Sequence, residues 1–483
     1  MIRFKKEGCS SKVWRQIQNF CRETTIHGLN IVGMPNLHPI ERLFWLLIVG
    51  TSAAGAIALT ISNWNRFVAN PTVISIEKDY RNWQNHIPAV TGCFNNKVDL
   101  QKAEKYIYKK WKIKPSDPKF EYYLEFVTAV TNATYINFHN FEKFGNDATL
   151  MDIDMAQLAL NVHPTITGLL LTVDKSREFK WNLILSELGI CFTFFAKFAR
   201  LLSIKNKENS TESEQIDDTL LFCHYLNGLC YARFDSDPTL PIKYYVHSYI
   251  EVPEISSKQH HELGKGSDME IDYRVIETQS SPEIKYLAPS QRKCRFDDEP
   301  IRKDVPVYSI SICQMGCRNN LAMKFCGCKP YFYHIFGGIP CNISGLLCLS
   351  QYSAFLTMTP SKMGCKCPQT CHFINYLPET PKVVLWDSGA YFDQRTTFRW
   401  GLLHPTTKYR RDILFGFGDL IVSFGGTLNL FVGVSFISIT EAVYLIIEGV
   451  FNMFKDEFIQ TRNRRIINKM KKRRIHPFMN TMY

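Results

Sequence analysis

An uninterrupted apolar segment near the N-terminus constrains the fold of this chain most strongly. Residues 43–62 read LFWLLIVGTSAAGAIALTIS, which is 20 residues without a charged side chain. At 1.5 Å per residue, such a helix spans about 30 Å, the thickness of the hydrocarbon core of a bilayer. Helices of soluble proteins rarely run this long without a polar face. We therefore expect a transmembrane helix over residues 43–62. It follows a basic segment of the chain, which is typical of a signal anchor and not of a cleaved signal peptide.

A second apolar segment, residues 419–450, is too long and too polar for a simple anchor. A straight helix of this length would measure about 48 Å, so it must tilt, protrude or break within a bilayer. Its acidic residues Asp419, Glu441 and Glu448 are expensive in hydrocarbon and are expected to face water or other helices. Small or polar residues also repeat with helical spacing, at Gly426, Asn429 and Gly433. These features are typical of a pore-lining helix.

Basic residues flank both apolar segments and predict the orientation of the chain. The formal net charge is +12. Residues 1–42 hold seven Lys and Arg against three Asp and Glu, and residues 451–483 hold nine against two. Because basic flanks stay on the cytoplasmic side, we expect both termini in the cytoplasm and residues 63–418 outside the cell. The basic tail then reflects topology and attraction to an anionic inner leaflet, and we expect no nucleic-acid partner.

Cysteines and glycosylation sequons agree with this topology. Of the 16 cysteines, Cys9 and Cys21 lie within residues 1–42, and the other fourteen lie within residues 63–418. An even number of cysteines in an oxidising compartment is sufficient for seven disulfides. Three N-x-S/T sequons fall in the same region, at Asn132, Asn209 and Asn342, and are expected to carry glycans.

Ten of these cysteines lie close together, between Cys294 and Cys371. Zinc binding is an alternative, but C-x-C and C-x₃-C are not the usual zinc-ribbon spacings, and an extracellular site would be oxidised. We therefore favour disulfides and expect no structural metal. The segment SICQMGCRNNLAMKFCGCKPYFY predicts a helix that is ended by Gly327 and Pro330. Several cross-links along one helix would make this element stiff.

The rest of the outer region mixes two kinds of secondary structure and predicts an α+β fold. The runs TVISIEKDY, WNLILSELGICFTFF and KYYVHSYIEVPEI are strand-like, whereas KAEKYIYKKWKIK and DIDMAQLALNV are helical. Residues 203–219 form a polar stretch that is typical of a solvated loop. The sequence contains no nucleophile elbow, zinc-protease, Walker or dinucleotide-binding motif. We therefore expect neither an enzyme nor a cofactor.

A set of short motifs also runs in a characteristic order along the chain. The segments are His27-Gly28, Pro88-Ala89-Val90-Thr91 with Cys93, SELGICFTF, YYVHSYIEVP, QRKCRFDDE, CQMGCRNNLAMKFCGCKPYF and YRRDILFGFGDLIVSFGGTLNLFVGVSFISITE. Together they resemble the degenerin/epithelial sodium channel family, and most closely its insect pickpocket branch. One His-Gly or G-x-S sequence means little, but the ordered set from residue 27 to residue 441 is specific.

The resemblance implies a plasma-membrane cation channel that is homo- or heterotrimeric, sodium-preferring and typically amiloride-sensitive. It implies two transmembrane helices and an outer domain shaped like a hand, with palm, finger and thumb, in which residues 294–371 form the thumb. It also implies nested disulfides, namely Cys93–Cys191, Cys294–Cys371, Cys313–Cys367, Cys317–Cys365, Cys326–Cys348 and Cys328–Cys341. Cys223 and Cys230 match no family position and remain as a further pair.

The same resemblance assigns the ion pathway. Residues Gly433, Val434 and Ser435 correspond to the G-x-S selectivity filter, where a break in the helix would turn backbone carbonyls towards sodium ions. Glu441 would place a carboxylate ring below the filter, and Asp419 would do so at the outer mouth. Gly433 has an alternative role in helix packing, and Glu441 has one as an interhelical hydrogen-bond acceptor.

Two further positions concern gating. The family's gate-adjacent degenerin position falls at Val422 or at the neighbouring Ser423, and Gly426 and Asn429 continue the pore stripe below it. His27-Gly28 resembles the cytoplasmic gating motif that precedes the first span.

Two other classes of protein share parts of this pattern. An ATP-gated trimeric channel also has two spans and a disulfide-rich outer domain, but it would need a lysine-rich nucleotide site. A two-pass receptor without a pore would not need a filter-like second span. The sequence does not indicate which extracellular ligand or stimulus opens such a channel, because protons, peptides, small molecules and force all act on members of the family.

Overall fold

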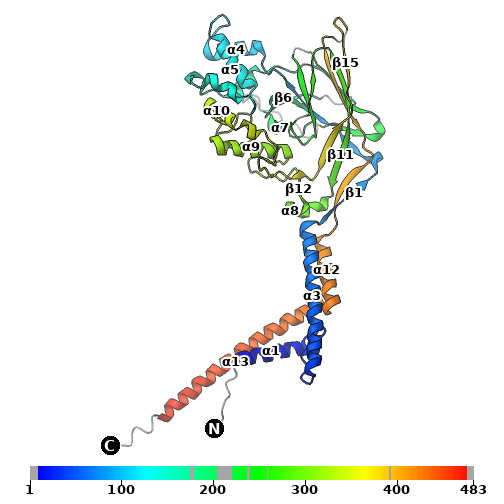
Figure 1. Cartoon of the computed structure of the whole chain (residues 1–483), viewed down its shortest axis with the longest axis vertical. Coiled ribbons are helices and arrows are strands. Elements are labelled where there is room, and N and C mark those ends of the chain that lie inside the picture. The colour runs from blue at the N-terminus through cyan, green and yellow to red at the C-terminus, as the bar shows by residue number, and fades with distance from the viewer. Residues whose placement is uncertain are drawn as a thin grey trace, which may run out of the picture. The chain divides into compact units, whose positions relative to one another are not determined.

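The computed structural model divides the chain into two compact units. Residues 1–72 together with 413–483 form one unit, and residues 73–412 form the other. Figure 1 shows the elements of each unit along the chain. The residues that the structure describes are 9–174, 179–203, 220–236, 240–257, 259–390 and 393–475. The expected glycosylation site Asn209 lies outside the described residues, as does most of the polar stretch 203–219.

Five helices make up the described part of the first unit. They are α1 (Cys9–Glu23), α2 (Leu29–Val32), α3 (Pro39–Ala69), α12 (Phe417–Val432) and α13 (Phe436–Ile475). By length and composition, α3 is able to cross a membrane. It is longer than the expected 43–62, because Pro39 occupies its first turn and the His38 side chain caps it. The pair α12 and α13 meets the same criterion only if its two parts form one span, and they are bent by 72°.

Helix α12 packs along α3, and the two lie side by side in Figure 1. Gly55 makes the close approach possible, because a Cβ added there would lie 2.8 Å from Cε1 of Phe431. Ala56 of α3 and Leu420 and Thr427 of α12 are buried. Leu420, Thr427 and Phe431 follow helical spacing, so one face of α12 packs against α3.

The second unit is built on two sheets. The larger has eight strands in the order β1-β17-β11-β16-β8-β4, and both β14 and β15 also pair with β11. Its strands are β1 (Thr72–Glu77), β4 (Gly168–Thr172), β8 (Cys230–Ser236), β11 (Ser267–Ser280), β14 (Phe373–Pro378), β15 (Lys382–Leu385), β16 (Thr396–Leu403) and β17 (Lys408–Ile413). Pairing within it is mixed, since β11 runs parallel to β16 and β17 but antiparallel to β14 and β15.

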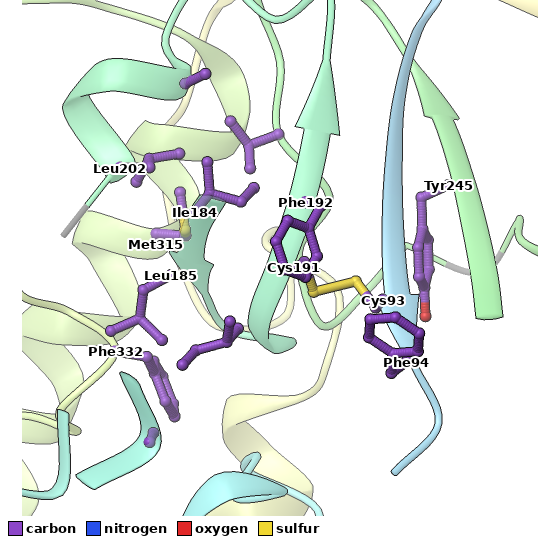
Figure 2. Packing of buried hydrophobic residues seen from close by; sticks show 14 of the residues in the cluster. Cys93, Phe94, Ile184, Leu185, Cys191, Phe192, Leu202, Tyr245, Met315 and Phe332 are labelled. Atoms are coloured by element: carbon purple, nitrogen blue, oxygen red, sulfur yellow. A yellow bond between two sulfur atoms is a disulfide. The ribbon is translucent and has the colours of Figure 1, made fainter. Parts of the chain in front are cut away.

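The smaller sheet has five antiparallel strands in the order β10-β9-β3-β6-β5. They are β3 (Ala89–Phe94), β5 (Asn182–Ser186), β6 (Gly189–Phe194), β9 (Ile242–His247) and β10 (His261–Leu263). Every residue of β3 and β6 is buried, so this sheet lies in the core. Figure 2 shows the disulfide Cys93–Cys191, which joins β3 to β6 among buried aromatic rings. Two short ladders complete the sheets, β2 (Gln84–His86) with β7 (Phe222–His224) and β12 (Cys294–Arg295) with β13 (Gln369–Thr370).

Helices of the second unit gather beside the sheets (Figure 1). The α-helices are α4 (Leu100–Trp111), α5 (Phe120–Thr131), α6 (Met155–Val162), α7 (Ala199–Leu202), α8 (Pro289–Arg292), α9 (Ile310–Cys326), α10 (Ile343–Gln351) and α11 (Ser353–Leu356). Short 3₁₀ turns include η2 (Phe138–Phe144) and η5 (Tyr225–Asn227). The expected α+β mixture is confirmed, with strands and helices on the segments whose periodicity predicted them.

The cysteine-rich region is organised around α9. Ser309 caps the start of this helix, and Gly327 ends it in the left-handed conformation with φ 70°, which is the expected end. The structure contains the same seven disulfides that were expected, namely Cys93–Cys191, Cys223–Cys230, Cys294–Cys371, Cys313–Cys367, Cys317–Cys365, Cys326–Cys348 and Cys328–Cys341. Four of them tie α9 and the residues just after it to later segments. Among the described residues, no cluster of three or more His, Cys, Asp or Glu side chains is arranged to hold a metal ion.

Candidate functional site: the broken helix and its N-terminal contacts

Helix α12 begins with an acidic cap. The Oδ2 atom of Asp419 accepts a hydrogen bond of 2.9 Å from the backbone N–H of Gly416. A carboxylate in the first turn also stabilises a helix through its dipole. Within one chain, Asp419 therefore serves the start of α12, and its second oxygen remains available for the expected role at an outer mouth.

The face of α12 opposite α3 carries the residues that were expected to line the pore. Val422 is 75% exposed, and Gly426 and Asn429 follow it on the same side of the helix. Ser423 follows helical spacing with the buried Leu420 and Thr427 and is only partly exposed, and its carbonyl accepts from the Thr427 hydroxyl at 2.7 Å. Of the two alternatives for the gate position, Val422 is therefore the one on the face that has no partner within the described chain.

The helical segment breaks at the expected filter residues. Gly433 adopts the left-handed conformation with φ 63°, and its N–H bonds to the Asn429 carbonyl at 3.0 Å, so α12 ends there. Ser435 caps the start of α13, because its hydroxyl accepts from the Ser438 N–H at 3.1 Å. Within the part of the chain that the structure describes, the carbonyl oxygens of Gly433 and Val434 accept no hydrogen bond. Those two oxygens are available to a ligand.

The His-Gly segment lies against this break. The His27 N–H donates to the carbonyl of Val432 at 3.2 Å, and a Cβ added at Gly433 would lie 1.9 Å from Nδ1 of the His27 ring. Gly28 has φ 82°, and a Cβ there would lie 2.6 Å from Val49 of α3. Both glycines therefore combine a left-handed backbone with a contact that a side chain would obstruct.

A cluster of side-chain oxygens follows the break. The Thr25 hydroxyl lies 2.5 Å from Oε2 of Glu441 and 3.2 Å from the hydroxyl of Ser438. Ser438 is buried and lies 3.1 Å from the hydroxyl of Ser435. Glu441 thus accepts a hydrogen bond from the N-terminal segment, while Glu448 is exposed further along α13. The part played by Thr25 was not predicted, although its position two residues before His27 was a usable signal.

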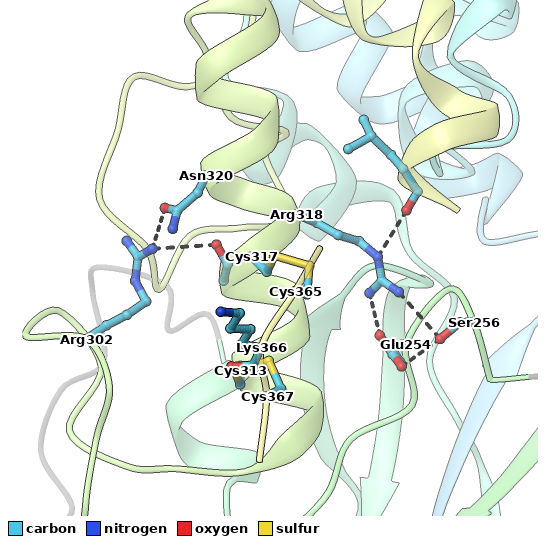
Figure 3. Close-up of a disulfide and its surroundings, with 12 residues drawn as sticks. Glu254, Ser256, Arg302, Cys313, Cys317, Arg318, Asn320, Cys365, Lys366 and Cys367 are labelled. Atoms are coloured by element: carbon cyan, nitrogen blue, oxygen red, sulfur yellow. Dashed lines mark hydrogen bonds and ion pairs between the residues drawn. A yellow bond between two sulfur atoms is a disulfide. The ribbon is translucent and has the colours of Figure 1, made fainter. Parts of the chain in front are cut away.

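The sequence did not predict a buried charged cluster in the second unit, of which Figure 3 shows Arg318, Glu254 and Ser256. Arg318 of α9 is fully buried and donates from Nη1 to the fully buried Glu187, at 2.9 Å from its Oε2, and to Glu254. The Nε of Arg318 donates to the carbonyl of Leu356 at 3.0 Å, and the Tyr333 hydroxyl donates to Glu187. Burial raises the pKa of Glu187, and the Arg318 cation opposes that shift. The cluster joins the β5–β6 turn to α9.

A cavity of about 370 Å³ lies at the N-terminal end of α9. Glu251 forms part of its wall and accepts hydrogen bonds from the N–H groups of Ile310 and Ser311, at 3.1 Å and 2.8 Å. Burial raises the pKa of Glu251, and these hydrogen bonds oppose the shift. Glu251 therefore joins the wall of the cavity to the first turn of α9.

Comparisons with known proteins agree with this arrangement. A family profile described as "Amiloride-sensitive sodium channel" matches residues 20–445, which include the His-Gly segment, the seven disulfides and the break in the second helix. The chain therefore belongs to the degenerin/epithelial sodium channel family and is a cation-channel subunit of that family. The family consists of ion channels and not of enzymes.

Individual relatives place the chain in the insect pickpocket branch. It is 24% identical over 467 residues to sodium channel protein Nach of Drosophila melanogaster, covering 89% of this chain and 86% of that protein. It is 25% identical over 212 residues to pickpocket protein 19 of the same species, covering 38% of this chain and 40% of that protein. It is 20% identical over 480 residues to acid-sensing ion channel 4 of Mus musculus, covering 91% of this chain and 81% of that protein.

Proposed function

We propose that this chain forms the pore of a sodium-selective, amiloride-sensitive channel in the plasma membrane. The observation that carries the proposal is the helix break at residues 433–435, where two backbone carbonyls have no partner in the described chain. Rings of such carbonyls replace part of the hydration shell of a cation. Several copies of the chain, or related subunits, are needed to close a ring, and we propose three.

The proposed topology has two spans. Residues 1–42 and 451–483 are cytoplasmic, residues 43–62 form the core of the first span, and residues 419–450 contain the second. Residues 63–418 are then extracellular, in agreement with their disulfides. The basic residues of the cytoplasmic ends lie near the anionic inner leaflet.

Each pore residue has a role in this proposal. Gly433, Val434 and Ser435 form the selectivity filter, and Glu441 attracts cations below it from a position held by Thr25. Asp419 supplies negative charge at the outer mouth. These carboxylates favour cations over chloride because like charges repel.

The gate is proposed at Val422, with Gly426 and Asn429 continuing the same face of α12. His27 and Gly28 couple the cytoplasmic segment to the filter through the His27 hydrogen bond to Val432. An extracellular stimulus acts on the outer domain, and its chemistry is left to experiment. Family membership favours this proposal over an ATP-gated channel or a two-pass receptor without a pore.

Current recording from oocytes tests the proposal directly. We expect an inward sodium current that amiloride blocks and that falls when external sodium is replaced by potassium. The screen applies pH steps, peptides and small molecules to the chain alone and with related subunits. A current that is equally large in sodium and potassium would contradict the proposed selectivity.

A cysteine pair tests the gate position. A positively charged thiol reagent should change the current of Val422→Cys, because that side chain lies on the open face of α12. Ser423→Cys is the matched control and should respond less, since Ser423 is only partly exposed. The reverse order would place the gate at Ser423.

A further inference from the structure

A groove runs along the helical part of the second unit, between α5 and η2. Its volume is about 690 Å³. The α5 wall is a single helix face, formed by Glu121, Leu124, Glu125 and Thr128, because residues three and four apart lie one above the other. Lys143 of η2 reaches across to Glu125, with 3.2 Å between Nζ and Oε2. The groove is therefore shaped by side chains from two elements.

Asn132 of the first described sequon lines the end of this groove. It is the C-cap of α5, four residues after Thr128, and so continues the same face. Its Oδ1 accepts from the Lys97 N–H at 3.0 Å, and its carbonyl accepts from Nδ2 of Asn137 at 2.8 Å. The Thr134 N–H donates to Oδ1 of Asn137 at 2.7 Å. The sequon is thus held in one conformation.

The groove has the chemistry that a carbohydrate requires. Carboxylates, amides, a hydroxyl and His139 line it as hydrogen-bonding partners for sugar hydroxyls. Leu124, which is half-buried, provides apolar surface for the C–H groups of a sugar ring. The lining is therefore mostly polar, which suits the many hydroxyl groups of a sugar.

We propose that this groove holds the first sugars of an N-linked glycan on Asn132. The inference rests on the extracellular location in the proposed function. In the glycosylation step, Nδ2 of Asn132 loses one proton and bonds to C1 of the sugar, and the lipid diphosphate of the donor leaves. The remaining N–H of Nδ2 can still donate to Oδ1 of Asn96, which lies 3.2 Å away. Because Asn132 lines the end of the groove, a glycan attached to it needs no diffusion to reach the groove.

Asn342 provides an internal comparison. It is exposed, and its Oδ1 caps α10 by accepting from the Gly345 N–H at 2.9 Å. A sugar on Nδ2 leaves that acceptor free, so the cap and a glycan are compatible. The two sequons therefore differ in the surroundings of the glycan, one in a groove and the other on an exposed helix start.

Enzymatic release of the glycans tests the proposal. The full chain is produced in insect cells and treated with peptide-N-glycosidase in its native state, and release at each site is followed by mass spectrometry. We expect glycan release from the native chain to be about tenfold slower at Asn132 than at Asn342, because release at Asn132 needs local opening of the groove. After unfolding, the two release rates should become equal. Leu124→Trp fills the groove and should accelerate release at Asn132. Ser344→Ala removes the other sequon and should leave the Asn132 rate unchanged.

Three results would overturn the proposal. They are equal native release rates at the two sites, no acceleration in Leu124→Trp, and a glycan on Asn342 with none on Asn132. If Leu124→Trp lowers the unfolding temperature, Thr128→Trp fills the same groove and replaces it. A chain without any glycan at Asn132 and Asn342 would contradict the extracellular location itself, which separates this outcome from failure of the groove alone.

Discussion

The buried charge cluster around Arg318 supports a quantitative prediction for Arg318→Met. Removing the guanidinium leaves Glu187, which is 0% exposed, without its cation. Breaking a buried ion pair in this way costs about 3–5 kcal/mol, since the remaining charge is uncompensated. At roughly 2–4 °C per kcal/mol, the unfolding temperature of the second unit should fall by about 10 °C.

Arg302→Met is the matched control for this substitution (Figure 3). Arg302 pairs with Asp304 at 2.7 Å, but the two side chains are 26% and 29% exposed. Pairs that water can reach contribute about 1 kcal/mol or less. The control should therefore shift the unfolding temperature by no more than about 3 °C.

A double-mutant cycle separates the pair from its surroundings. Glu187→Gln should be milder than Arg318→Met, because Arg318 keeps its contact with Glu254. The free energy of unfolding of the double variant should fall by less than the sum of the two single decreases, and the difference should be about 1–3 kcal/mol. Unfolding of the purified chain in detergent, followed by intrinsic fluorescence, provides these values. Equal shifts for Arg318→Met and Arg302→Met, or additive effects in the cycle, would refute the reasoning.

Three other substitutions have defined outcomes. Gly433→Ala should abolish the current while sparing surface expression, because its Cβ would overlap the His27 ring; a normal current would contradict the contact. Burial lowers the pKa of His247 to about 4, so unfolding free energy should fall as pH drops from about 6.5 to 4, and His247→Gln should flatten this slope in thermal unfolding. Replacing Cys223 and Cys230 by Ala should lower the free energy of unfolding by about 2–3 kcal/mol, because the unfolded chain regains the entropy of an open loop for a separation of 7 residues. Calorimetry of this variant and of the native chain measures the difference.

Local patterns in the sequence were sufficient for much of the fold. The end of α9 at Gly327 follows from the residue's tolerance of positive φ, and strand and helix runs follow from their periodicity. The length of residues 419–450 indicated only that the segment must tilt, protrude or break in a bilayer, and the resemblance to the family's G-x-S filter placed the break at Gly433. These features depend on residues that are neighbours along the chain.

Contacts between distant residues could not be predicted in the same way. Thr25 and Glu441 are separated by 416 positions, and nothing in a single sequence pairs them. Glu187 and Arg318 each look like an ordinary surface charge until the fold buries both. The approach of Gly55 to Phe431 depends on the register of two helices, which neither helix specifies alone.

The nested order of the disulfides has a consequence for biosynthesis. Synthesis runs from the N-terminus, so Cys313 and Cys317 become available before Cys365 and Cys367, their partners in the folded chain. Until those partners are synthesised, an oxidant can pair Cys313 and Cys317 only with each other or with other cysteines that are not their partners in the folded chain. Any bond that forms between them at that stage must later be exchanged through mixed disulfides. Disulfide isomerase is then expected to be needed for these cysteines to reach their native pairing.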